Sequence, residues 1–61
     1  MLCYYAKSLR TYLNLSPKQL AKLANVYAKS VELMESGAPV QLGDKRKIMA
    51  ALYMRKANNY A

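Results

Sequence analysis

The chain contains no histidine, one cysteine and only three acidic residues among 61. Cys3 therefore has no partner for an internal disulfide, a catalytic pair or a cysteine and histidine metal site. Paired carboxylates and a glycine-rich phosphate loop are also missing, and the whole sequence holds two glycines. These absences predict a reduced, cytoplasmic protein that is not an enzyme and binds no metal, cofactor or small-molecule ligand.

Long apolar runs are absent as well. The first residues, MLCYYAKSLR, lack the apolar stretch of a secretory signal, and no segment approaches the ~20 apolar residues of a membrane span.

Positive charge is in excess, because ten Lys and Arg against three acids give a net charge of +7. Such a surface attracts nucleic acid or an anionic membrane, and the charge alone does not choose between them.

A chain of 61 residues is expected to form one domain, residues 1–61, that buries roughly 60% of its unfolded surface. Its stability is expected to be marginal unless a partner chain adds buried area. Apolar residues recur at helical spacing, and no period-two run suggests a strand. We expect an all-α, compact fold of four to five helices, at about 2–13, 17–24, 28–36 and 44–57.

The predicted core follows from the apolar stripe of each helix. Its members are Leu2, Ala6, Leu9 and Leu13 in the first helix, Leu20, Ala21, Leu23 and Ala24 in the second, Val31 and Met34 in the third, and Ile48, Met49, Ala51 and Leu52 in the fourth. Val26 follows the second helix and is expected to pack against Leu20 and Val31 in the angle between the second and third helices.

Two helix starts carry clear signals. Ser16 and Gln19 predict a capping box, and Pro17 occupies the first helical position, where no amide is needed. Asp44 is expected to cap the fourth helix after a loop, GAPVQLG. The starts of the second and fourth helices are therefore predicted at Pro17 and at about residue 44.

The helix ends indicate a tight corner between the second and third helices. Asn14, Asn25 and Gly37 are residue types that accept the left-handed backbone conformation at the end of a helix. Ala21 and Ala24 are small enough to let two helices cross closely, and only about three residues separate the predicted helices. Such a corner suits DNA binding, although any small helical bundle can use it.

The segment SPKQLAKLANVYAKSVELMESG resembles the helix-turn-helix of the Cro/repressor family of phage and bacterial regulators. The matching positions are Ser16, Leu20, Ala21, Val26, Val31, Met34, Glu35 and Gly37, and Asn25 replaces the turn glycine. LGDKRKIMAAL is similar to the family's fourth helix and KSLRTYLNLS to its first. The resemblance implies a lambda-repressor-like fold and a Cro-like transcriptional repressor of phage or mobile-element type, associated with the nucleoid.

In this family the start of the third helix, here 28–36, enters the major groove of a palindromic operator. By correspondence, the expected base-reading residues are Tyr27, Ala28, Lys29, Glu32 and Leu33. Phosphate contacts are expected from Ser16, Pro17, Lys18, Lys22, Ser36 and Gln41. Pro17 stands where the family usually has glutamine, and the loop APVQLG lacks the family's basic residues. Lys45, Arg46, Lys47, Arg55 and Lys56 can compensate through general attraction.

Two further expectations concern pairs and partners. Lambdoid members often join an arginine late in the first helix to a glutamate ending the third, which implies a structural ion pair between Arg10 and Glu35. Tyr53, Met54 and Tyr60 are candidate contacts of a homodimer, because tyrosine and methionine are enriched in interfaces. A dimer is expected at least on DNA.

Two alternatives stay open from the residues alone. The third helix is rich in alanine, valine, leucine and methionine, so the same fold can serve as a protein-interaction module of antirepressor or antitoxin-like kind. The basic, tyrosine-rich ends of the chain favour the second alternative, binding to a membrane surface. Salt-dependent binding to duplex DNA distinguishes a DNA-binding regulator from the protein-interaction module.

Overall fold

Four α-helices form the part of the chain that the computed structural model describes, namely the backbone of residues 2–60 and the side chains of residues 5–58. They are α1 (Leu2–Tyr12), α2 (Pro17–Ala24), α3 (Ala28–Ser36) and α4 (Leu42–Tyr60). The expected all-α class is confirmed, and no strand lies between residues 2 and 60. A fifth helix does not form there, because α4 continues unbroken past Leu52.

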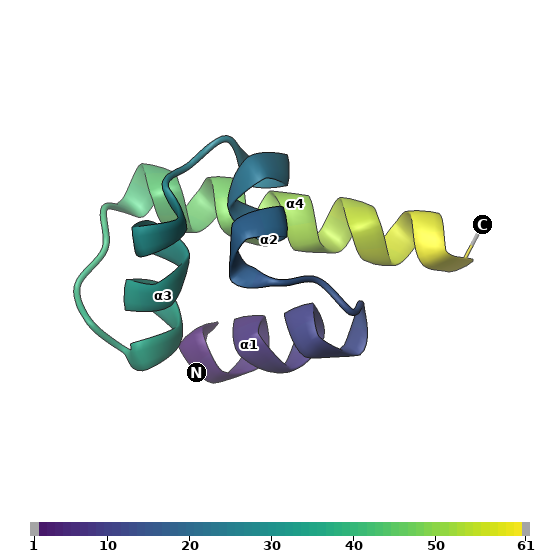
Figure 1. Cartoon of the computed structure of the whole chain (residues 1–61), viewed down its shortest axis with the longest axis horizontal. Helices are drawn as coiled ribbons and strands as arrows, with labels where there is room; N and C mark the ends of the chain where they lie inside the picture. The colour runs from purple at the N-terminus through teal and green to yellow at the C-terminus, as the bar shows by residue number, and fades with distance from the viewer. Residues whose placement is uncertain (1, 61) are drawn as a thin grey trace.

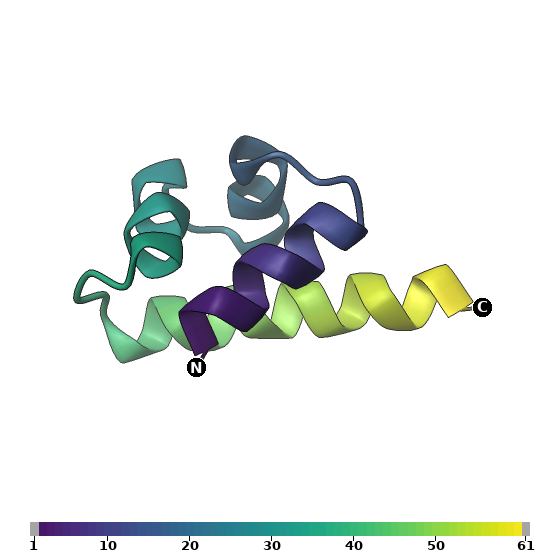
Figure 2. The same cartoon turned by 90° about the horizontal axis from the view of Figure 1, so that it is seen from below.

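The longest helix, α4, packs against each of the other three, and α2 also packs against α3. Seen from below, α2 and α3 lie on one side of α4, while α1 crosses it (Figure 2). The C-terminal end of α4 extends past the other helices (Figure 1), and the chain measures 33 × 21 × 18 Å. One side of this extension is therefore left without a neighbouring helix.

The predicted start of α2 is confirmed in detail. The Ser16 Oγ accepts the Gln19 amide at 3.1 Å, and the Gln19 Oε1 accepts the Ser16 amide at 2.8 Å. Pro17 occupies the first helical position. Asn14 and Asn25, which follow α1 and α2, both adopt left-handed conformations, with φ of 58° and 60°. Local polar groups therefore set both bounds of α2, as its sequence predicted.

The predicted start of the fourth helix is wrong by two residues. Helix α4 begins at Leu42, so Asp44 lies in its first turn and is not its N-cap. The Asp44 carboxylate instead accepts a hydrogen bond from the Ser30 Oγ of α3 at 3.2 Å. Leu42 is 61% exposed, so no apolar periodicity marked the two extra residues. An acidic side chain stabilises the first turn of a helix through the helix dipole without capping it.

The core collects the buried faces of all four helices. Leu20, Val31 and Leu52 are 0% exposed and form its centre with Ile48. The remaining buried members of the cluster are Ala6, Leu9, Ala21, Ala24 and Met34. Partly buried residues packed against this cluster include Leu13, Val26, Met49 and Ala51, each of which was expected in or beside the core. The side chain of Leu2 lies outside the described residues.

One member of the predicted core is misplaced. Leu23 was assigned to the apolar stripe of α2, but 52% of it is exposed. The buried face of α2 is made by Leu20, Ala21 and Ala24, and the side chain at position 23 points roughly 100° away from the centre of that face. Because α3 and α4 cover only this face, Leu23 remains in solvent.

Candidate nucleic-acid interface

The corner between α2 and α3 places the start of α3 at the surface. Asn25 turns the chain in the left-handed conformation, and the Val26 amide returns to the Ala21 carbonyl at 3.0 Å. Ala21 and Ala24 are buried residues of α2, and α2 packs against α3. Tyr27 then stands at the N-cap of α3 without a side-chain capping bond. The geometry therefore presents Tyr27 and the first turn of α3 outward.

The residues expected to read bases divide into two groups. Tyr27 is 84% exposed, and Lys29 and Glu32 are also exposed. Leu33 is half-buried on the same face of α3, because positions 29, 32 and 33 have the spacing of one helical face. Ala28 packs against the core cluster and offers little free surface. Tyr27, Lys29 and Glu32 are thus the side chains with room to reach a ligand.

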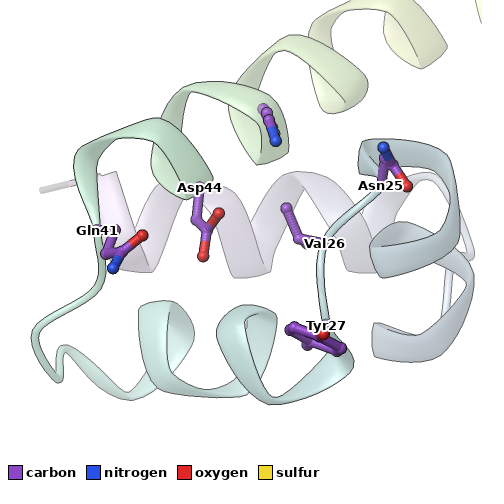
Figure 3. A pocket seen from close by; sticks show the side chains of 6 residues that line it. Asn25, Val26, Tyr27, Gln41 and Asp44 are labelled. Carbon is purple, nitrogen blue, oxygen red and sulfur yellow. The ribbon is translucent and has the colours of Figure 1, made fainter.

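A groove of about 440 Å³ lies between this corner and the first turns of α4. Gln41 lies at one end and Asn25 and Tyr27 lie toward the other, with Asp44 and Val26 between them (Figure 3). The lining is completed by Lys47. The sequence had not linked Asp44 or Lys47 to Tyr27, because only the packing of α4 against the corner brings them together. Gln41 was expected near the interface, and it is exposed beside it.

The expected phosphate contacts are scattered over the surface. At the start of α2 the Ser16 amide is already bonded to Gln19 and Pro17 has no amide, which leaves the Lys18 amide as the free donor. Ser36 donates its hydroxyl to the Leu33 carbonyl at 2.9 Å. Lys22 is exposed but borders a different cavity, next to Arg55. The structure therefore does not gather these groups into one site.

Arg10 and Glu35 form the ion pair that the resemblance implied. The guanidinium Nε and Nη2 donate to the two carboxylate oxygens of Glu35 at 2.5 and 3.0 Å, and Nη1 donates to the Leu15 carbonyl at 2.7 Å. The two side chains are only 13% and 11% exposed. This bidentate pair joins the end of α3 to α1, and Arg10 also joins both to the α1–α2 connection through Leu15. The Glu35 carboxylate is therefore already paired with Arg10 within the protein.

Two of the three candidate dimer residues, Tyr53 and Met54, have described surroundings, and their neighbours differ. Tyr53 packs against Tyr5 of α1, with ring centroids 6.4 Å apart. Met54, 68% exposed, instead borders a groove beside Leu23 of α2. The side chain of Tyr60 lies outside the described residues. Tyr53, at 51% exposure, still leaves an aromatic surface open between α1 and α4.

The described part of the chain has neither a membrane-spanning helix nor a cluster of metal ligands. No helix there is long and apolar enough to cross a membrane, and no three metal-ligating side chains come together. The chain was also compared with protein-family models, curated proteins and solved structures. None of them matches it.

Proposed function

We propose that the chain is a Cro-like transcriptional regulator in which α2 and α3 act as a helix-turn-helix and bind a specific DNA sequence. The observation that carries this proposal is the α2–α3 corner, which exposes Tyr27, Lys29 and Glu32 at the start of α3. The net charge of +7 adds a general attraction to the phosphate backbone. A helix presented in this way can enter the major groove with its first turns against base edges.

Each exposed side chain has a definite chemistry in the major groove. Lys29 donates to guanine O6 and N7, and the Glu32 carboxylate accepts from cytosine N4. Tyr27 and Leu33 offer apolar contact to thymine methyl groups. Polar readout is therefore limited to two side chains, and the remaining preference is expected to come from methyl contacts and DNA shape.

Phosphate contacts in this proposal come from both ends of the α2–α3 unit. The Lys18 amide and side chain serve one strand, while Gln41 and Lys47, which line the same groove as Tyr27, serve the other. Lys22 and Ser36 remain further candidates at the edges. Two copies that meet through the open surface around Tyr53 would place two α3 helices on half-sites about 34 Å apart.

Selection of binding sites from a random duplex pool tests the proposal directly. A palindrome with one preferred sequence per half-site is expected to be enriched. Affinity for that duplex should fall with salt along a log–log slope of about −0.9 per phosphate contacted. Failure to enrich any sequence, together with loss of duplex binding near physiological salt, would refute the regulator.

Replacing Lys29 with alanine is expected to relax the preference at one position in each half-site. The lost discrimination should be about 1–3 kcal/mol, because one guanine contact is removed. The measurement is the affinity of the variant for the selected duplex and for the same duplex changed at each position. Lys7→Ala is the matched control, because Lys7 is an exposed lysine of α1. Lys7→Ala should lower the affinity for every duplex by the same small factor. If Lys29→Ala leaves the base preference at every position unchanged, Lys29 does not read a base.

A second function is favoured by the exposure of Tyr27, at 84%, together with half-buried Leu33 on α3. Aromatic and apolar side chains of this kind are common at the centres of protein interfaces. The same surface would then bind another protein, as an antirepressor or antitoxin-like partner does. Site selection distinguishes the two functions, because a DNA sequence is enriched only if the chain is a DNA-binding regulator.

A further inference from the structure

A second groove, which we term the α2–α4 groove, runs between α2 and the C-terminal half of α4. It consists of two cavities of about 170 and 340 Å³ that share Leu23 and Arg55 as lining residues. Ala51 and Met54 extend it along α4, and Lys22 borders it on α2. None of the side chains proposed to read bases lines it, so this surface is separate from the start of α3.

The groove has an apolar floor that no part of the described chain covers. Leu23 is 52% and Met54 68% exposed, and Ala51 is half-buried between them. The residues that line the two cavities belong to α2, to α4 and to Leu15, and none belongs to α1 or α3. Neighbouring apolar side chains rimmed by polar residues are typical of interaction sites on small proteins.

The charges around this groove select one kind of occupant. Its charged lining residues, Lys22 and Arg55, are both cations, and no acidic residue lines it. A second copy of the chain is poorly matched, because it brings a charge of +7 and only three acids. Of these, Glu35 is paired with Arg10 and Asp44 accepts from Ser30. A partner with carboxylates around an apolar stripe complements both the positive charge of the groove and its apolar floor.

We propose that the α2–α4 groove docks an acidic amphipathic helix of a partner protein. The apolar stripe of that helix packs on Leu23, Ala51 and Met54, and its flanking carboxylates pair with Lys22 and Arg55. This docking leaves the exposed face of α3 free, because none of its proposed base-reading side chains lines the groove. Lys22 is shared with the candidate phosphate contacts, so the partner helix and duplex DNA compete for that one side chain.

Two synthetic peptides test this proposal. Each has about 16 residues, roughly 24 Å of helix, with the same leucine stripe, and the flanking positions hold glutamate in one peptide and lysine in the other. The amide resonances of the isotope-labelled full chain are followed during titration. The acidic peptide should shift the signals of Leu23, Ala51 and Met54, and the basic peptide should shift none of them.

Matched variants separate docking from general attraction. Leu23→Gln should weaken the acidic peptide at least about tenfold, because an apolar anchor is lost. Leu42→Gln, the control at a leucine 61% exposed on α4, should change its affinity by less than about twofold. Arg55→Gln should likewise weaken the peptide several-fold more than Arg46→Gln, another exposed arginine of α4. Circular dichroism shows whether each variant retains its helices.

Four results would overturn the proposal. The first is equal binding of both peptides, and the second is an equal loss in Leu23→Gln and Leu42→Gln, which indicates attraction without a groove. The third is a DNA duplex that shifts the same groove signals and displaces the peptide, which assigns the surface to nucleic acid. The last is a dimer in sedimentation that Leu23→Gln abolishes, which assigns it to a second copy of the chain.

Discussion

Replacing Glu35 with alanine is expected to lower the free energy of unfolding by about 3–5 kcal/mol, because Arg10 is left charged, nearly buried and without its carboxylate. Arg10 is 13% exposed and has no other acidic partner within the described structure. A domain of this size rarely has more than about 3–5 kcal/mol to lose. The variant should therefore be largely unfolded at 25 °C, as measured by urea denaturation followed by circular dichroism.

The control for this prediction is Glu32→Ala. Glu32 lies one turn earlier on α3 and is exposed, so its removal should change the stability by less than about 0.5 kcal/mol. Equal stability of the two variants would contradict the structural role of the Arg10–Glu35 pair. In the double variant Arg10→Met with Glu35→Leu, no charge is left unpaired. It should regain part of the loss, although the Leu15 carbonyl then lacks its donor.

A second large effect is expected in the core, where Leu20→Ala should destabilise the protein by about 2–5 kcal/mol. Leu20 is 0% exposed and belongs to the core cluster that all four helices form, so its truncation leaves a cavity inside that core. Thermal or urea unfolding of the variant measures this loss. In a domain with so small a core, the change is comparable to the whole stability.

Leu23→Ala is the matched comparison, because it removes the same atoms three residues later in the same helix. Leu23 is 52% exposed, so its truncation should cost less than about 1 kcal/mol. If Leu23→Ala were as destabilising as Leu20→Ala, the orientation of α2 described above would be wrong. The pair therefore tests the rotation of α2 about its own axis as well as the strength of the core.

Helix bounds set by local chemistry were predictable from the sequence. Ser16, Gln19 and Asn25 cap α2 through bonds to residues no more than four positions away, and such bonds form wherever those residue types occur at that spacing. The start of α4 was missed, because its first residue is exposed and its acidic residue is bonded to α3. A side chain with a distant partner does not mark a local boundary.

The candidate interface was predictable only in part. Exposure of Lys29 and Glu32 follows from their polarity and their place opposite Val31 and Met34. The groove that joins Tyr27 to Asp44 and Lys47 depends on how α4 packs against the corner, and no local pattern contains that information. The ion pair of Arg10 with Glu35, 25 residues apart, was reached through a family resemblance and not through spacing.

The sequence by itself determined the helical class, the positions of the left-handed turns and most of the core, because these depend on periodicity and on neighbouring residues. Only the tertiary structure decided which apolar residues stay exposed. Leu20 and Leu23 belong to the same predicted stripe, yet one is the centre of the core and the other borders an open groove beside Met54. The difference arises because burial depends on which face of α2 the other helices cover, and that is settled by packing.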